Sequence, residues 1–297
     1  MAEHSRHQLA ARRRRRRQER LLEGSLLVCA MTSIVAVTII TVFVFAGGLP
    51  LIVREGLSDL VFGRVWRPLQ GLFGILPMIA GSIMVTVGAL VLAVPASLLG
   101  AVFMAEFAPE RVANVLRPTI QLLAGIPSVV YGFWGLVVLV PFLRNFFGGS
   151  GFSAVAGAII LAIMILPTII NLSEDALRSV PREFKEGSMA LGATHWQTVK
   201  HVQVPAAMQG IVTGVILGMG RAIGETMAVI MVTGNVPGMP SSVLDPVRTL
   251  TANIVIEMAY AHGDHMEALF ATGVVLFVFI MMLNLSINWW RRKEVNY

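Results

Sequence analysis

The chain has 297 residues, of which 56% are hydrophobic and only 13% are charged. A soluble domain averages about 25% charged residues, so this composition excludes a soluble globular protein. The net charge of +6 comes mainly from the segment 6–20, "RHQLAARRRRRRQER", which stands directly before the first apolar run. A basic flank in that place is typical of the cytoplasmic side of a membrane helix, and we expect no nucleic-acid partner.

Six apolar runs predict six membrane-spanning helices. About 20 apolar residues cross the hydrocarbon core, and backbone groups in lipid must pair within their own element, so we expect an all-α bundle. The first run is too long for the apolar region of a signal peptide and is expected to be retained. Cys29 lies in it and, as the single cysteine, excludes an internal disulfide and a cysteine metal site. The expected spans are 25–46, 74–104, 119–142, 154–173, 206–234 and 266–290.

The distribution of lysine and arginine predicts that both ends of the chain are cytoplasmic. With the N-terminus inside, 17 of the 23 Lys and Arg residues fall in cytoplasmic segments and five in external ones. Positive residues collect on the cytoplasmic side, so this ratio supports an even number of spans. Trp289 and Trp290 before "RRK" fit an aromatic belt that closes the last helix. We expect a basic cytoplasmic tail over 1–24 and one transmembrane domain over 25–297.

Proline and glycine are expected to interrupt several of the predicted spans. A broken membrane helix is tolerated where the freed backbone faces protein or a water-filled cavity, so several breaks in one bundle favour a transport pathway. Gly and Pro are also commoner in membrane helices generally, which leaves a plain structural reading open. The residues concerned are Pro95, Gly125, Pro127, Pro141 and Pro167.

The polar segment between the fourth and fifth spans, about 174–205, is expected to begin with a short helix. Ser179 suits the cap of that helix and Pro181 suits its first turn. The pattern "PREFKEGSMAL" then runs helically as far as Gly192, a residue that suits the left-handed position just after a helix end.

A second short helix is predicted directly after this glycine. Thr194 and Gln197 stand at the spacing of a capping box, in which the two side chains satisfy each other's backbone N–H groups. The helix is expected to end before Pro205. Two capped helices make a rigid projection into the cytoplasm, although a loop that only stabilises the neighbouring spans is the alternative.

This segment resembles the signature loop of ABC-importer permeases. The family pattern is EAA, three residues, Gly, nine residues, then I-x-L-P, and this sequence has Glu-Gly-Ser, Gly and Val-Gln-Val-Pro at the same spacing. EGS replaces EAA, which keeps the acid and two small residues. The resemblance implies that the loop inserts into an ATP-hydrolysing subunit, and that the coupling residues are Glu186, Gly187, Ser188, Gly192, Ala193, Thr194 and Pro205.

The source of energy is expected to lie outside this chain. The sequence contains no G-x-x-x-x-G-K-[ST] phosphate-binding loop, so it would borrow ATP hydrolysis from a partner. We therefore expect a chain that is not itself an enzyme and that needs no cofactor.

Four further stretches resemble the permeases of phosphate-specific (Pst) ABC importers. They are "WRPLQGLFGILPMIAGSIMVT", "LLAGIPSVVYGFWGLVVLVP", "GRAIGETMAVIMVTGN" and "RTLTANIVIEM". The Met-Ala-Val after "GET" and the later "TLTA" are more similar to the C-type subunit than to its A-type partner. The resemblance covers about 60–290. It implies an importer-type helical permease in a bacterial inner membrane, with a second permease subunit, two ATPase subunits and a periplasmic phosphate-binding protein.

Two charges inside the fifth span are the candidate pathway residues. Arg221 sits about 15 residues into that span, which is near mid-membrane at about 1.5 Å per residue. A charge there costs at least about 2.5 kcal/mol and commonly marks a pathway. Its guanidinium suits phosphate oxygens. Glu225 lies one turn further along the same helical face, where it would hold the guanidinium in an empty site or admit only a protonated oxyanion. A structural salt bridge is the alternative for both.

The external segments carry weaker candidates. His262, Asp264 and His265 ("HGDH") are metal-ligand types, but charged loop residues are the default there and no metal site is expected. Other residues suggest contact with a delivery protein. These are Thr249, Thr251 and Asn253 in a predicted lip helix, and Arg64, Trp66 and Arg67 in the first external loop.

Three other functions stay open from the residues alone. A permease for another oxyanion, such as molybdate or sulfate, would share these features. A self-sufficient secondary transporter or channel would need no docking loop. A membrane-anchored nucleic-acid binder would use the basic tail and would bind with strong salt dependence.

Overall fold

The structure, a computed structural model, describes the backbone of residues 2–294 and the side chains of residues 22–285. Among the described residues, five helices are long and apolar enough to cross a membrane, and a bent helix pair brings the number to six if it is one span. The all-α membrane bundle expected from the sequence is therefore confirmed. The five are Leu22–Glu55, Leu76–Phe107, Ser128–Phe147, Ala154–Arg178 and Asp264–Leu285, and the bent pair is His195–Ala206 with Met208–Gly224.

The regular structure of the described chain consists of helices and one short hairpin. The hairpin is antiparallel and pairs Trp66 with Phe73 and Arg67 with Leu72. In chain order the elements are α1 (Ala2–Glu55), α2 (Leu57–Phe62), β1 (Trp66–Arg67), η1 (Pro68–Gln70), β2 (Leu72–Phe73), α3 (Leu76–Val102), η2 (Phe103–Phe107), α4 (Glu110–Gly125), α5 (Ser128–Trp134), η3 (Gly135–Leu139), α6 (Val140–Phe147), α7 (Ala154–Arg178), α8 (Arg182–Ala190), α9 (His195–Thr198), η4 (Val199–Gln203), α10 (Val204–Ala206), α11 (Met208–Gly224), α12 (Met227–Val232), α13 (Leu250–Glu257) and α14 (Asp264–Glu294).

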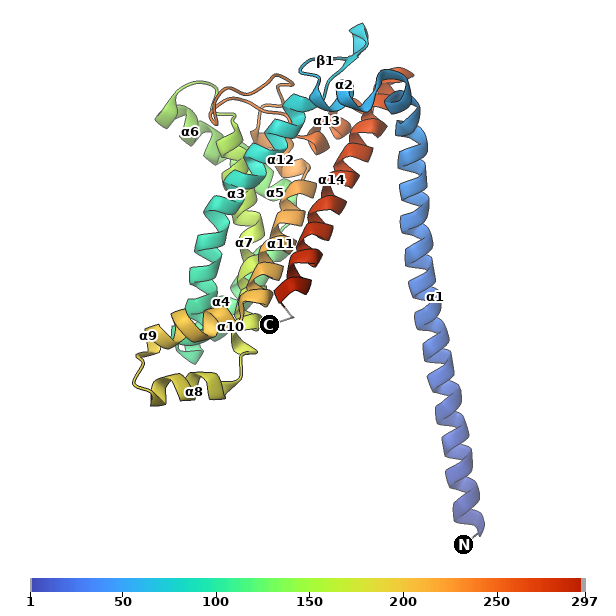
Figure 1. Ribbon diagram of the computed structural model, residues 1–297, viewed down its shortest axis with the longest axis vertical. Coiled ribbons are helices and arrows are strands. Elements are labelled where there is room, and N and C mark those ends of the chain that lie inside the picture. The colour runs from blue at the N-terminus through green and yellow to red at the C-terminus, as the bar shows by residue number, and fades with distance from the viewer. Residues whose placement is uncertain (1, 295–297) are drawn as a thin grey trace.

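The first helix, α1, leans away from the rest of the bundle and meets it in the C-terminal part of α1 (Figure 1). It crosses α14 at two glycines, since a Cβ on Gly48 would stand 2.7 Å from the backbone N of Ala271. Beside this crossing, the rings of Phe43 and Phe270 pack edge to face with centroids 5.4 Å apart. The tail expected over 1–24 is, from Ala2 onwards, the first part of the same helix.

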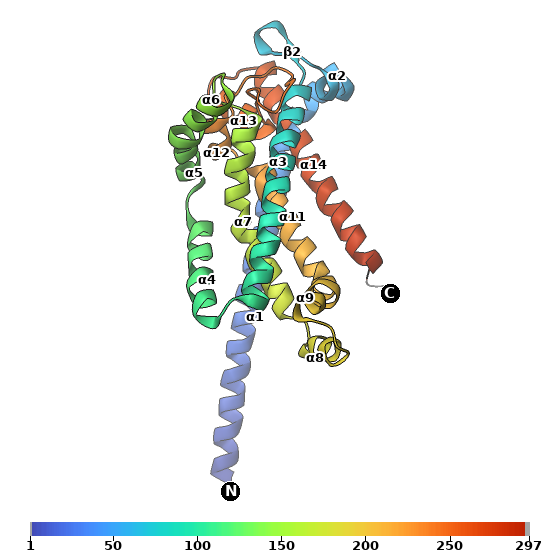
Figure 2. The ribbon, with the colours of Figure 1, turned by 90° about the vertical axis from the view of Figure 1, so that its left-hand side faces the viewer.

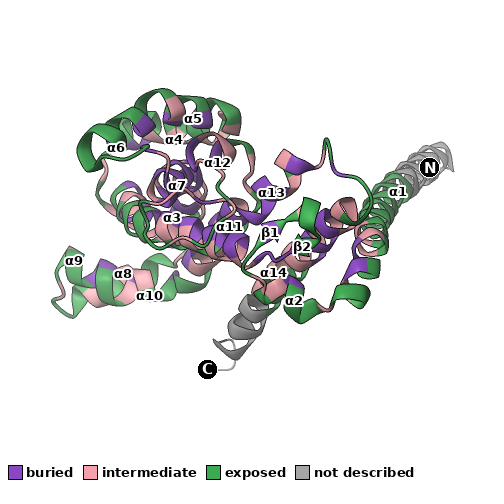
Figure 3. Cartoon of the chain, turned by 90° about the horizontal axis from the view of Figure 1, so that it is seen from above, coloured by how far each residue is buried: buried purple, intermediate pink, exposed green. Residues whose placement is uncertain are grey.

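Helix α7 is the centre of the bundle. The buried residues gather on α7 and on the sides of its neighbours α3 and α11 (Figure 3). Val85 and Ala89 of α3 belong to one buried apolar cluster with Ile160 and Ile165 of α7. α11 approaches α7 through a glycine, because a Cβ on Gly218 would lie 2.9 Å from the side chain of Ile169. Close packing of this kind is how membrane helices associate without a hydrophobic driving force.

Only part of the predicted pattern of breaks is found. The third predicted span, 119–142, is broken at Ile126 and Pro127, between α4 and α5. The predicted breaks at Pro95 and Pro167 are wrong, because both prolines lie inside continuous helices. Pro141 lies at the start of α6, directly after the π-helical η3, and the chain stays helical there.

The fifth predicted span, 206–234, is also two helices. α11 ends at Gly224, and α12 starts at Met227 after two non-helical residues. No proline marks this break, and Gly224, which ends α11, is one of several glycines in this span.

The two ends of the bundle carry different segments (Figures 1 and 2). The start of α1, the α3–α4 turn, α8 to α10 and the last turns of α14 lie at one end, the inner end. The hairpin, α2, α6 and α13 lie at the other, the outer end. The segments that the Lys and Arg distribution assigns to the cytoplasm all lie at the inner end. Successive connections between the spans therefore alternate between the two ends, as the sequence predicts.

Candidate functional site

The loop between α7 and α11 folds into two short helices, as predicted. Gly192 follows α8 with a φ of +89°, which is the left-handed region that favours glycine. The capping box is complete: the Thr194 side chain accepts from the Gln197 N–H, and the Gln197 side chain accepts from the Thr194 N–H at 2.9 Å. We call residues 182–206 the docking loop.

Two details of this prediction are wrong. Ser179 does not cap α8: it ends α7, and α8 follows Pro181 without a side-chain cap. Pro205 does not follow the second helix, because helical structure continues through η4 and α10 to Ala206. Pro205 stands in α10, which follows the π-helical η4 directly, and the chain stays helical there.

The residues of the family motif have distinct positions in the docking loop. Glu186 and Gly187 are exposed, and a Cβ on Gly187 would meet nothing within 4 Å. Ser188 lies partly buried, and its hydroxyl is 3.0 Å from the hydroxyl of the buried Thr198 in α9. The third motif position thus joins the two helices, which explains why a small residue suffices there. Ala193 is partly buried, whereas Thr194 and Pro205 are exposed.

Four apolar side chains on the docking loop were missed by the sequence analysis. Leu191 at its tip is 91% exposed. A contiguous exposed apolar surface is commonly a site of contact with another protein. The spacing of the four side chains in a short polar loop gives no periodic signal, so only the structure reveals them. They are Phe184, Met189, Leu191 and Trp196.

Replacing Thr194 with alanine is expected to loosen α9. The change removes a cap worth about 1 kcal/mol, and amide hydrogen exchange at the start of α9 should then rise about fivefold. Thr194→Ser keeps the hydroxyl and should leave exchange near that of the parent. Equal exchange in Thr194→Ala would show that the capping box does not hold this turn.

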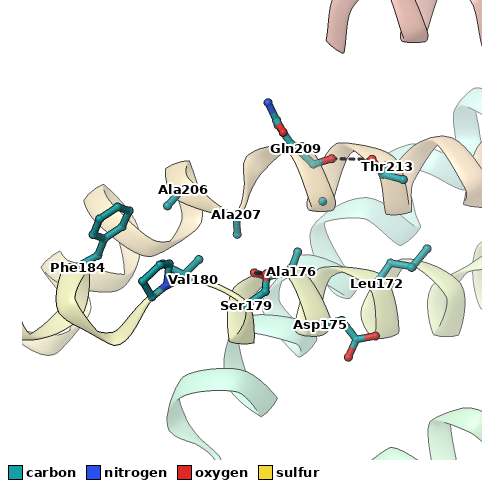
Figure 4. A pocket seen from close by; sticks show the side chains of 12 residues that line it. Leu172, Asp175, Ala176, Ser179, Val180, Phe184, Ala206, Ala207, Gln209 and Thr213 are labelled. Atoms are coloured by element: carbon teal, nitrogen blue, oxygen red, sulfur yellow. Dashed lines mark hydrogen bonds between the residues drawn. The ribbon is translucent and has the colours of Figure 1, made fainter. Parts of the chain in front are cut away.

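The docking loop meets α11 at a sharp elbow. The helix pair bends by 68° at Ala207. Beside the elbow is a cleft of about 500 Å³, and Figure 4 shows Ala206 and Ala207 on one side of it with Ala176 and Ser179 of α7 on the other. One helical turn past the elbow the packing closes again, because a Cβ on Gly210 would collide with that of Ala176.

Arg221 lies in the last turn of α11 and faces the middle of α7. Its Nη1 donates to the Thr168 hydroxyl at 3.5 Å. At 1.5 Å per residue, Thr168 stands about 21 Å from the outer end of α7 and about 15 Å from its inner end. Tyr131 of α5 donates its hydroxyl to the Leu123 carbonyl at 2.8 Å.

The guanidinium of Arg221 has most of its hydrogen-bonding capacity free. Among the residues whose side chains the structure describes, the long bond to Thr168 is the one hydrogen bond that it makes, and it forms no ion pair. A guanidinium offers five N–H donors. The group is partly buried at mid-depth of the bundle, so an anion that arrived there would find donors available.

The predicted pairing of Glu225 with Arg221 is wrong. Glu225 does not continue the helical face, since α11 ends at Gly224 and the Glu225 backbone is extended. Its carboxylate accepts from the Ala228 N–H at 3.2 Å, and its carbonyl accepts from the Thr251 hydroxyl at 3.0 Å. Glu225 therefore holds the break between α11 and α12, including the first turn of α12.

The outer end is held by a buried carboxylate. Glu257 of α13 accepts from Arg248, from the indole N–H of Trp66 at 2.9 Å and bonds to His265 at 2.7 Å. Trp66 is only 5% exposed, so it ties the hairpin to α13 and does not present a docking surface. The lip helix is confirmed as α13, but Thr249, Thr251 and Asn253 are buried and do not face outwards. Arg64 and Arg67 are exposed.

The "HGDH" residues do not converge. Asp264 accepts from Arg54 at 2.8 Å, whereas His265 bonds to Glu257. Among the residues that the structure describes, no three His, Cys, Asp or Glu side chains are grouped as metal ligands.

Comparison with protein families matches residues 97–293 to the family described as "Binding-protein-dependent transport system inner membrane component". A probable ABC transporter permease protein of Bacillus subtilis, YqgH, is 45% identical over 266 residues, which are 86% of each chain. The phosphate transport system permease proteins PstC of Mesorhizobium japonicum and Haemophilus influenzae are 35% and 34% identical. The first match covers 82% of this chain and 81% of its relative, and the second 89% and 90%.

Solved structures share the fold. An inward-facing structure of the MetNI methionine ABC transporter superposes with a TM-score of 0.60 at 19% identity, over 77% of this chain and 99% of that one. A bacterial alginate ABC transporter, solved with its pentasaccharide-bound periplasmic protein, gives a TM-score of 0.58 at 15% identity, over 89% and 94%. Both likenesses are too distant in sequence to indicate more than the architecture.

Proposed function

The chain belongs to the family of binding-protein-dependent transport system inner membrane components, and from this membership we propose that it is the C-type membrane subunit of an ATP-driven phosphate importer. The likeness to phosphate transport permeases supports phosphate as the cargo, because it extends over most of both chains. The C-type motifs "GETMAV" and "TLTA" support the choice between the two Pst permeases.

The single observation that carries this proposal is the state of Arg221. It is a permanent cation at mid-depth of a membrane bundle, and its one described hydrogen bond is long. Placing a charge there costs at least about 2.5 kcal/mol, and such a cost is met where the charge serves a pathway. A guanidinium binds phosphate oxygens through two parallel N–H bonds. Arg221 would thus neutralise and orient the anion as it passes.

Glu225 has a supporting part in this proposal. Its carboxylate is engaged with the α12 backbone, so it sets the position of the break that follows Arg221. The break keeps α12 from continuing α11 as one rigid helix. An anion near Arg221 would therefore lie beside backbone that is not locked into a single helix.

The exposed side chains of the docking loop support a cytoplasmic ATPase subunit as a partner of this chain. The loop's exposed apolar side chains would enter a cleft on that subunit, with Glu186 and Thr194 at the margin. Two such subunits, a second permease subunit and a periplasmic phosphate-binding protein would complete the importer. Closure of the ATPases on ATP would push the loop, tilt the bundle and expose the Arg221 region to each side in turn. No chemical step takes place in this chain.

The location of the proposed complex is the bacterial inner membrane, with both termini in the cytoplasm. The excess of Lys and Arg at the end that carries the docking loop supports this orientation. ATP is available only on that side, which agrees with the placement of the loop.

One alternative keeps the mechanism and changes the cargo. The same guanidinium would bind sulfate or molybdate, and the name of the Bacillus relative states no ion. A self-sufficient secondary transporter is disfavoured by the docking loop, because exposed apolar residues at its tip have no use without a partner protein.

Reconstitution of the complete complex tests the proposed function. Vesicles that contain both permease subunits and the ATPases, supplied with phosphate-loaded binding protein, should accumulate labelled phosphate only when ATP is present on the ATPase side. Excess sulfate or molybdate should not compete. Accumulation of phosphate by vesicles that contain this chain alone would refute the proposal, and competition by sulfate would reassign the cargo.

A further inference from the structure

A buried carboxylate at the inner end of α3 fastens the docking loop. Glu106 belongs to η2, and its side chain is only 7% exposed. It accepts from Lys185 Nζ at 2.6 Å and from Gln203 Nε2 at 2.8 Å, and it lies 3.2 Å from His195 Nε2. These three groups come from α8, α9 and η4. Both arms of the docking loop therefore converge on one acid of a different span.

Aromatic packing strengthens the same junction. The ring of Phe107, the next residue, lies 4.8 Å from the ring of His195 and 6.2 Å from that of Trp196. The π-helical turn of η2 makes this convergence possible, because a wider turn re-aims the side chains at the end of α3.

A second buried acid joins η2 to the rest of the inner end. Glu174 of α7 accepts from Arg117 of α4 and from Arg178, both at 2.8 Å. Arg178 also donates to the carbonyl of Met104 in η2 at 2.9 Å. The end of α3, the middle of α4 and the end of α7 thus form one cross-linked base, and Glu106 attaches the docking loop to that base.

The docking loop is attached to α3 by side-chain hydrogen bonds, but to α11 by the continuous backbone. This backbone passes through the 68° elbow at Ala207, beside the open cleft of about 500 Å³. The elbow can bend by rotation about backbone bonds towards the cleft (Figure 4), while Ala207 itself stays buried in an apolar cluster with residues of α3 and α7. At η2 a load on the docking loop is resisted by the three hydrogen bonds to Glu106 and by the tilted ring contact between Phe107 and His195.

We propose that Glu106 is the positioning residue through which movement of the docking loop enters the bundle, so that α3 moves with the loop while α11 yields at Ala207. This inference rests on the proposed function, because it requires an ATPase that moves the loop. Since η2 is tied to α7, a shift of α3 carries α7 along. The contact between Thr168 of α7 and Arg221 of α11 then changes, which links the loop to the pathway.

The test removes the charge of Glu106 and keeps its size. Glu106→Gln is placed in the complete transporter in proteoliposomes, with phosphate-loaded binding protein and ATP on opposite sides. Phosphate imported, ATP hydrolysed with and without binding protein, and the amount of assembled complex are measured. The matched control is Glu110→Gln, an exposed acid in the first turn of α4. Lys185→Met and the double variant test whether the two residues act through their contact.

We expect Glu106→Gln to lower the phosphate imported per ATP hydrolysed about fivefold, the low end of coupling between distant sites. Assembly and hydrolysis without binding protein should match the parent, and Glu110→Gln should leave the ratio unchanged. The double variant should be no worse than Glu106→Gln alone, because residues that share one contact are not additive.

Two results would overturn the inference. One is an unchanged ratio in Glu106→Gln. The other is a parallel loss of assembly and of hydrolysis without binding protein, which would make Glu106 a residue that only holds the loop folded. Failure of the parent complex to import phosphate is a separate outcome, because it refutes the proposed function. The number of ions imported per ATP hydrolysed, measured with the ion that the complex does import, then still decides the role of Glu106.

Discussion

Phosphate uptake is expected to fall about 100-fold when Arg221 is replaced with glutamine, since a bond to a charged group is worth up to about 3 kcal/mol. Glutamine keeps a polar side chain but loses the charge and most of the N–H donors. The fold should be little affected, because the one described hydrogen bond of Arg221 is at the limiting length of 3.5 Å. Uptake of labelled phosphate by cells with the complete transporter gives the first measurement, and ATP hydrolysis by the purified complex gives the second.

Two variants separate the chemistry of Arg221 from its packing. Arg221→Lys keeps the charge and loses the planar fork, so its uptake should lie between those of the parent and Arg221→Gln. Thr168→Ala removes only the long hydrogen bond and should stay close to the parent. Normal uptake by Arg221→Gln would remove Arg221 from the pathway and leave the phosphate assignment without its physical basis.

The surroundings of Arg221 agree with the proposal that a second permease subunit completes the pathway. Gly220 and Gly224 flank it on α11, both are exposed, and a Cβ on either would meet nothing within 4 Å. Among the described residues the guanidinium of Arg221 forms no ion pair, and the helix backbone beside it is uncovered. This chain alone therefore does not enclose an anion. A second permease subunit that faces this side of α11 would enclose the ion and exclude lipid, which agrees with the paired permeases that the Pst resemblance implies.

Features set by neighbouring residues could be predicted from the sequence. The capping box needs only Thr194 and Gln197, and the left-handed turn needs only a glycine at the end of a polar helix, so both were predicted correctly. Span positions followed from runs of apolar residues. In each case the interaction partners stand within a few residues of one another.

Features that depend on distant residues were missed or predicted wrongly. Glu106 looked like an ordinary acid near the end of a span, and its three partners lie between 79 and 97 residues further along the chain. The break at Glu225 is held in part by Thr251, which no local pattern connects to it. The predicted breaks at Pro95 and Pro167 were wrong, since both prolines lie inside continuous helices. Proline inside a membrane helix is tolerated when neighbouring groups satisfy the freed carbonyl.

Replacing Gly192 with valine is expected to uncouple ATP hydrolysis from transport. A Cβ at this position would meet nothing within 4 Å, so the variant introduces no clash. The penalty lies in the backbone, because a β-branched residue at a φ of +89° is strained by about 1–3 kcal/mol. The strain is relieved if the turn between α8 and α9 opens, which would move the exposed Leu191 and Trp196 apart. Phosphate uptake should fall more than about tenfold, within the range of coupling energies.

Two control variants separate backbone strain at Gly192 from the effect of adding a side chain. Gly192→Asn should lose much less uptake, because asparagine tolerates the left-handed region. Gly24→Ala lies in the regular part of α1, outside the docking loop and with open space around it, and it should behave as the parent. Hydrolysis without binding protein should be similar in all three variants, since the ATP sites belong to the partner subunits. A valine variant with intact uptake would show that the relative placement of the two helices does not matter, and the docking loop would then have to act through one helix alone.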